Sequence, residues 1–178
     1  MVPRILSNRE ARGPVGMIGG WIAAALARLG LRPPPELARG ALSPGRSNES
    51  DVRSLLGKPD AVHDGDGGGR ILEYPRGPAG TETWMVEIGP DDRYRGMRNV
   101  LVDASFARLE PGDSIDDVRR RLGRPGGSAD FPRRGERILS WKYRADDGRL
   151  EHFNAHFDGQ GRLTGVSRTP DPESINAQ

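Results

Sequence analysis

The chain has 178 residues, 34% of them hydrophobic, with 25 glycines and 15 prolines, which allows one domain or two very small ones built from short elements and many turns. Its 27 basic and 25 acidic residues nearly cancel to a net charge of +2, so charge gives little support to nucleic-acid binding. The absence of cysteine excludes disulfides, thiolate metal sites and cysteine nucleophiles, and also a lipid-modified cysteine in the chain as given.

Residues 1–34 resemble a weak export signal. A basic region is followed by an uncharged run over residues 15–27, which ends in the small-x-small form of a cleavage site. The run is too short to span a bilayer as a stable anchor. The alternative is an ordinary helix over residues 21–29, ended by Gly30 and a block of prolines. We therefore predict a signal-like or disordered segment before residue 35.

One helical segment occurs twice, at residues 44–59 and 112–125. In the second copy, Ser114 or Asp113 can cap the helix, and acidic residues follow in the first turn, where the helix dipole favours them. An apolar stripe at spacings of three and four indicates one buried face. Glycine and proline then end the helix in both copies, at Gly57 and Gly123.

After each copy the hydrophobic period changes from 3.6 to 2, which predicts strands. The expected helices and strands are residues 35–42, 48–56, 70–74, 83–88 and 94–102, then 103–109, 114–122, 137–143, 150–157 and 162–168. The two series are offset by 66 to 67 residues. The sequence therefore predicts an α+β fold of two tandem helix-helix-strand-strand-strand repeats, residues 35–102 and 103–169, with antiparallel sheets packed on helices on one face. The repeats either pack together or form one continuous sheet, and residues 170–178 are expected to be a disordered tail.

Few residues point to chemistry. His152 and His156 have the spacing of a helical metal pair, but on a strand they lie ~13 Å apart and cannot share an ion. His63 has no partner in the sequence. The Asp-Gly-rich segment at residues 64–69 lacks a full set of calcium ligands, and no helix follows it to complete a phosphate loop, so a hairpin loop is the better interpretation. We predict no catalytic, cofactor-binding or metal-binding residue, and no enzyme activity.

Aromatic residues on the predicted strands are the remaining candidates. A concave aromatic sheet face could receive a partner loop or peptide, and the partner-binding candidates are Tyr74, Trp84, Trp141 and Tyr143. The alternative is that these side chains pack in the core between sheet and helices.

The order of the repeated motifs resembles the BamE (SmpA/OmlA) family of bacterial outer-membrane lipoproteins. The second copy carries the closer match, at Pro111-Gly112, Val118, Leu122-Gly123-Arg124-Pro125, Trp141-Lys142-Tyr143, Phe157-Asp158 and Gly161-Arg162-Leu163. The first copy keeps Gly45, Val52, Leu56-Gly57-Lys58-Pro59 and Tyr74, so the resemblance covers about residues 36 to 168. The doubling is also similar to the architecture of the β-lactamase inhibitor protein.

The resemblance implies a small periplasmic accessory protein at the outer membrane, which supports assembly of β-barrel proteins by contacting other subunits. This chain departs from BamE in having two units and no tethering cysteine. We expect partners among envelope proteins, including β-barrel assembly subunits, and peripheral contact with the outer membrane, but no nucleic acid and no small-molecule substrate. The alternative is a periplasmic or secreted inhibitor module that binds an enzyme through the sheet.

Overall fold

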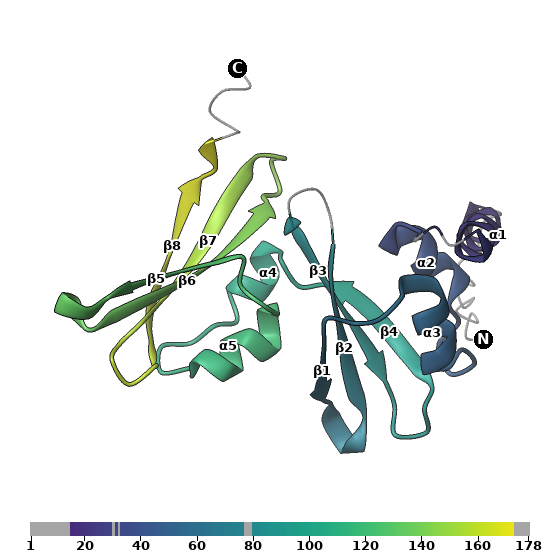
Figure 1. Ribbon diagram of the computed structural model, residues 1–178, viewed down its shortest axis with the longest axis horizontal. Coiled ribbons are helices and arrows are strands. Elements are labelled where there is room, and N and C mark those ends of the chain that lie inside the picture. Colours follow the sequence, from purple (N-terminus) through teal and green to yellow (C-terminus); the bar gives the residue numbers. More distant parts are fainter. Residues whose placement is uncertain (1–14, 30, 32, 77–79, 173–178) are drawn as a thin grey trace, which may run out of the picture.

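The structure is a computed structural model that describes residues 15–29, 31, 33–76 and 80–172 (Figure 1). Before and within the first unit lie α1 (Val15–Arg28), α2 (Pro35–Ala41), α3 (Glu49–Leu56), β1 (Ala61–Asp64), a 3-10 turn (Asp66–Gly68), β2 (Arg70–Arg76), β3 (Glu82–Ile88) and β4 (Tyr94–Asn99). The second unit comprises α4 (Asp103–Phe106), α5 (Ile115–Leu122), β5 (Gly127–Phe131), a 3-10 turn (Pro132–Arg134), β6 (Glu136–Arg144), β7 (Leu150–Phe157) and β8 (Leu163–Pro170). The predictions for residues 1–14 and 173–178 lie outside the described residues.

Each unit is an antiparallel meander, with strand orders β1-β2-β3-β4 and β5-β6-β7-β8. This confirms the α+β class and the two repeats, and it shows two separate sheets rather than one continuous sheet. The prediction of three strands per repeat missed β1 and β5. Both are edge strands: β1 has only four residues, and every residue of β5 is exposed, so neither carries a strong apolar alternation.

Each sheet buries one apolar face against its own helices. In the first unit, Leu72 and Tyr74 of β2 and Val86 of β3 pack with Val52 and Leu56 of α3. The equivalent cluster of the second unit is formed by Val118, Leu122, Leu139, Trp141, Tyr143, Phe153, Ala155 and Phe157, together with Leu101, Phe106 and Leu163. The units therefore have separate hydrophobic cores of the same design.

The repeated helices begin with the same capping box. Asn48 Oδ1 accepts from the backbone N–H of Asp51 at 2.9 Å, and Ser114 Oγ accepts from the backbone N–H of Asp117 at 3.1 Å. In each case the acidic side chain accepts from the N–H of the capping residue in return. Ser114 is thus the cap of α5, as one of the two predicted alternatives.

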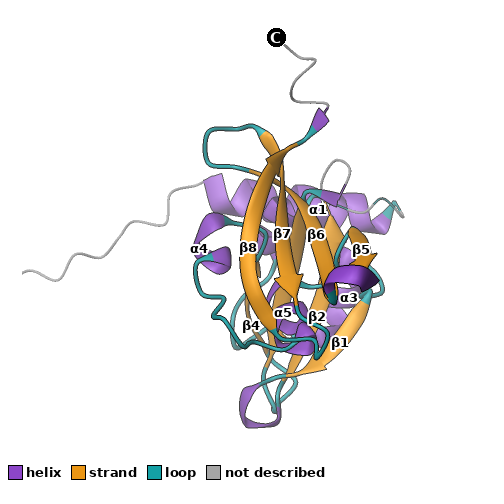
Figure 2. Cartoon of the chain, turned by 90° about the vertical axis from the view of Figure 1, so that its left-hand side faces the viewer, coloured by secondary structure: helices purple, strands orange, loops and turns teal. Residues whose placement is uncertain are grey.

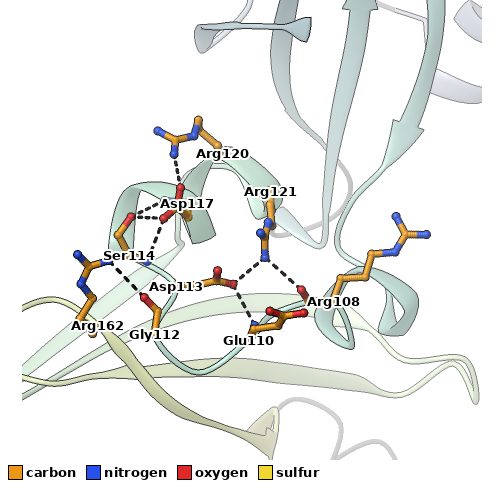
Figure 3. Close-up of polar contacts among 9 residues, drawn as sticks. All are labelled: Arg108, Glu110, Gly112, Asp113, Ser114, Asp117, Arg120, Arg121 and Arg162. Carbon is orange, nitrogen blue, oxygen red and sulfur yellow. Dashed lines mark hydrogen bonds and ion pairs between the residues drawn. The ribbon is translucent and has the colours of Figure 1, made fainter.

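Asp113 does not cap the helix but holds the turn before it, as Figure 3 shows. Its Oδ2 accepts from the backbone N–H of Glu110 at 3.0 Å and from Arg121 Nη1 at 2.6 Å, while the same Arg121 nitrogen donates to the carbonyl of Arg108 at 3.1 Å. Arg162 Nη1 donates to the carbonyl of Gly112 at 3.3 Å. These contacts fix the turn before α5 to the last turn of the helix and to the start of β8.

The two units are stacked so that α4 and α5 lie on the side of the second sheet that faces the first unit (Figure 1). The contact is tight at the end of α5. The backbone N–H of Arg124 donates to Glu73 Oε1 at 2.7 Å, and a Cβ on Gly123 would lie 2.7 Å from Thr83 Cγ2. The Glu73 carboxylate is only 2% exposed, and its other oxygen lies 2.8 Å from His63 Nε2. The outward face of the first sheet is therefore covered here by the second unit.

Candidate functional site

The outward face of the second sheet, called the open face below, has no equivalent cover. Along β6 and β7, alternate residues turn inward to α4 and α5, so the residues between them turn outward. Figure 2 looks onto this side, with β6, β7 and β8 in front. The outward side chains include those of Glu136, Ile138, Ser140, Lys142, His152, Asn154, His156, Ser167 and Thr169, and also that of Phe131 on β5, which pairs with Glu136.

A hydrogen-bonded series crosses the middle of the open face. Ser140 Oγ on β6 donates to Asn154 Oδ1 on β7 at 2.7 Å, and Asn154 Nδ2 donates to Thr169 Oγ1 on β8 at 3.3 Å. Asn154 is nearly buried, whereas Thr169 is exposed. The amide therefore holds two hydroxyl groups in fixed positions at the surface.

A second series joins three strands through His156. Its Nδ1 lies 2.8 Å from Glu136 Oε1 on β6, and its Nε2 lies 2.8 Å from Ser167 Oγ on β8. The hydrogen bond from His156 holds the pKa of Glu136 below its usual range, with a further contribution from Arg134. Since the ionised carboxylate can only accept, Nδ1 carries a proton and donates to Glu136, and in the neutral imidazole Nε2 then accepts from the Ser167 hydroxyl.

This serine–imidazole–carboxylate order is also found in serine hydrolases, where the imidazole activates the hydroxyl. Hydrolysis further requires a recess for substrate and hydrogen-bond donors for the oxyanion. Of two open depressions in the described part of the chain, one lies beside Lys58 and Arg76. The other is lined by Ile115, Asp130 and Glu136 and so borders the carboxylate of this cluster, but neither is lined by His156 or Ser167. The sequence analysis missed this cluster because its members lie on three strands and share no motif.

A cluster of ion pairs lies on the open face near the end of β8. The Asp171 carboxylate is 5% exposed, and its Oδ2 lies 2.7 Å from His152 Nε2 and 3.1 Å from Lys142 Nζ. Residues 170–172 of the predicted tail thus continue the fold, because Asp171 is anchored by these contacts and by its N–H, which donates to the carbonyl of Leu150 at 3.0 Å.

The structure places the histidines as follows. His152 and His156 lie on β7, as predicted, and each contacts a different carboxylate, Asp171 or Glu136. His63, which has no partner in the sequence, meets Glu73 on the neighbouring strand. Within the described residues, no group of three or more histidine, aspartate or glutamate side chains is arranged to hold a metal ion.

The four aromatic residues predicted to bind a partner are all 7% exposed or less. Two of them make the same contact in both units: Tyr74 OH donates to the carbonyl of Gly57 at 3.0 Å, and Trp141 Nε1 donates to the carbonyl of Gly123 at 3.1 Å. Burial raises the pKa of Tyr74 to about 12, so its hydroxyl remains a donor at neutral pH. These residues fasten the last turn of each repeated helix to its sheet, which is the core-packing alternative given above.

Trp84 and Tyr143 are also engaged inside the fold. Trp84 Nε1 donates to Glu82 Oε2 at 2.8 Å, and Tyr143 OH donates to Glu151 Oε2 at 2.8 Å. Tyr143 also packs edge-on against Phe106 of α4, with ring centroids 4.8 Å apart. The side-chain polar atoms of all four aromatics thus have hydrogen-bond partners inside the fold.

Comparison with protein-family models gave no match, and neither did comparison with curated proteins. Several solved structures are similar in part. A protein described as a candidate osmotically inducible lipoprotein, OsmE, is 26% identical over 37% of this chain and 75% of its own, with a TM-score of 0.34. A DUF4309 family protein (YjgB) from Bacillus subtilis is 16% identical over 85% of this chain and 97% of its own, with a TM-score of 0.30. A candidate β-lactamase inhibitor protein from Streptococcus mutans is 11% identical over 75% of this chain and 94% of its own, with a TM-score of 0.29.

Proposed function

We propose that this chain is a non-enzymatic interaction protein of the cell envelope, similar to the assembly factor BamE and active in the periplasm at the outer membrane. The observation that carries the proposal is the difference between the two sheets. The outward face of the first sheet is closed by the second unit at Glu73 and Thr83, whereas the open face of the second sheet is covered by no described element of the chain.

The chemistry of the open face supports a protein partner. Its hydroxyl, amide and imidazole groups are held by hydrogen bonds between strands, so these side chains lose little further conformational freedom when a partner binds. Fixing side chains in advance lowers the entropy cost of association. The face carries both donors and acceptors, which suits a polar loop or strand of another envelope protein, including a β-barrel assembly subunit.

A second candidate is an inhibitor module of the β-lactamase inhibitor type. The two-unit architecture of the chain, with one sheet face free, is the observation in its favour. Both functions use the open face, and they differ in the partner: an assembly subunit for the first and a hydrolase for the second.

Site-specific photo-crosslinking in cells tests the proposal. A photoreactive amino acid replaces Thr169, which is exposed on the open face, and a control replaces Val62, which is 49% exposed in the first unit. We expect an envelope protein to be captured at position 169 and not at position 62. Capture of an assembly subunit supports the first function, and capture of a hydrolase supports the second. Absence of any captured protein at position 169, or fractionation of the chain with the cytosol alone, would contradict both.

A further inference from the structure

Strand β5 is an exposed edge of the second sheet. Figure 2 shows it at one side of this sheet, with β8 at the other, and among the described strands it pairs with β6 alone. All of its residues are exposed. The edge strands β4 and β8 carry charged residues or a proline, which discourage pairing with another chain: Arg95 and Arg98 in β4, Arg168 and Pro170 in β8. β5 contains no proline, and its one charged side chain, Asp130, is bound by Arg137 of the same copy at 2.5 Å.

The register of β5 shows which of its backbone groups point away from the sheet. The carbonyl of Ser140 on β6 accepts from the N–H of Gly126 at 2.9 Å, so the backbone of Ser140 faces β5. Alternate residues of an antiparallel ladder face the same neighbour, and Ser140 is paired with Gly127, so the odd-numbered residues of β5 face β6. The N–H and C=O groups of Ser128 and Asp130 therefore point outward, where only an added strand can pair with them in a regular ladder.

We propose that β5 pairs antiparallel with β5 of a second copy of the chain, which joins the two second sheets edge to edge. The strand sequence Gly-Ser-Ala-Asp-Phe fits itself in a register centred on Ala129. In this register Ser128 of each copy lies opposite Asp130 of the other, so their outward N–H and C=O groups exchange hydrogen bonds. The neighbouring registers pair fewer residues, and one of them sets the two Asp130 carboxylates opposite each other, which is unfavourable.

The side chains of the strand are complementary in the same register. Phe131, which is 37% exposed, lies opposite Gly127 of the second copy, and an aromatic side chain covers the backbone that a glycine leaves bare. The two Ala129 residues face each other in a pair without hydrogen bonds, where Cα atoms approach to about 4.5 Å and methyl groups fit. Ser128 can donate to the Asp130 carboxylate of the other copy, which is 57% exposed. Each of these contacts occurs twice about a twofold axis, as a symmetric dimer requires.

This pairing places the open faces of both copies on one side. The twofold axis between two antiparallel edge strands runs perpendicular to the sheet, so each copy turns the same face to the same side. Two four-stranded sheets thus become one continuous sheet with a doubled open face. The pairing goes beyond the proposed function and does not depend on the partner of the open face, because it requires only the chain itself.

The test is analytical ultracentrifugation of the purified full chain from about 1 μM to about 300 μM, a range that detects the weak, reversible association expected of a short edge. We expect the average mass to rise from 19.4 kDa towards twice that value. Hydrogen exchange gives a second measurement on the unchanged chain. The backbone N–H groups of Ser128 and Asp130 should exchange more slowly at high protein concentration than at low concentration, because only the dimer pairs them.

Matched variants test the register. Ala129→Glu sets two like charges opposite each other at the axis and should lower the association constant by about fivefold or more, and Ala129→Lys should do the same. An equimolar mixture of the two variants should associate again, because Glu then faces Lys. Val166→Glu makes a similar change on the opposite edge strand, β8, at a side chain that is 51% exposed, and should leave association unchanged.

Several results would overturn the inference. One is a chain that stays monomeric up to about 300 μM and shows no concentration-dependent protection of Ser128 and Asp130. Another is association that Ala129→Glu leaves intact, that Val166→Glu weakens equally, or that the mixture of Glu and Lys variants does not restore. A third is a photoreactive residue at position 129 that captures a different protein in cells and never a second copy, because the edge would then belong to that partner. Capture at position 169 tests the open face separately, so failure of one proposal leaves the other standing.

Discussion

Gly123 is the position at which the repeated helix, its own sheet and the other unit meet, and replacing it tests the stacking of the two units. Its φ of 79° and ψ of −168° lie in a region that is almost exclusive to glycine, so an alanine costs about 1–3 kcal/mol in backbone strain. The added Cβ would lie 2.7 Å from Thr83 Cγ2 and 2.8 Å from Glu73 Oε1, and such overpacking costs about 1–3 kcal/mol more. We expect Gly123→Ala to lower the free energy of unfolding by roughly 2–6 kcal/mol.

A double-mutant cycle separates the two causes. Thr83→Ser removes the methyl group nearest to the new Cβ, so Gly123→Ala should be less destabilising in that background by about 0.5–2 kcal/mol. Urea denaturation followed by tryptophan fluorescence and circular dichroism gives the four free energies. A coupling energy below about 0.3 kcal/mol would refute the proposed contact between the units, since additive effects are expected of residues that do not touch. Gly45→Ala, at a φ of 75° with no atom within 4 Å, is the control for strain without crowding.

Three further predictions concern the caps and the open face. Ser114→Ala should cost about 1 kcal/mol in urea denaturation, and a change no larger than that of an exposed surface substitution would contradict the capping role. Hydrogen bonds from Ser114 hold the pKa of Asp117 below its usual range, so the box stabilises the folded protein at neutral pH, and this contribution is lost as the pH falls through the folded pKa, below about 4. In an NMR titration Ser114→Ala should raise the pKa of Asp117, and an unchanged value would show that another group lowers it. Ser167 should not react with a fluorophosphonate probe, because His156 and Glu136 form part of a structural network, and labelling that Ser167→Ala abolishes would instead demonstrate an activated serine.

The sequence was informative where local physics decides the structure. The stop at Gly123 and a cap at Ser114 or Asp113 follow from residue types that suit one backbone conformation or one free N–H group. The structure confirms the stop and assigns the cap to Ser114. Strands with aromatic alternation, such as β6 and β7, were also predictable. β1 and β5 were not, because their pairing depends on the neighbouring strand rather than on their own residues.

The open face shows where sequence reasoning ends. The contacts of His156 with Glu136 and Ser167 depend on the register between three strands, which no spacing in the chain reveals. The burial of Trp141 illustrates the opposite difficulty: an aromatic on a strand fits a core and a binding face equally well. Only the position of α5 over the sheet shows that Trp141 belongs to the core.

The buried carboxylate of Glu73 requires that the two units follow one another in this order along the chain. Its oxygens accept from the Arg124 backbone and meet His63, so this acid is shielded only while the second unit follows the first. The residue at the same place in the second unit is Ser140, which follows Leu139 as Glu73 follows Leu72 and faces the open side. Exchanging the units along the chain would bring the acid to the water and leave a serine to meet the neighbouring helix. The two copies are therefore alike in architecture but not interchangeable, because the residue at this sheet position differs between them.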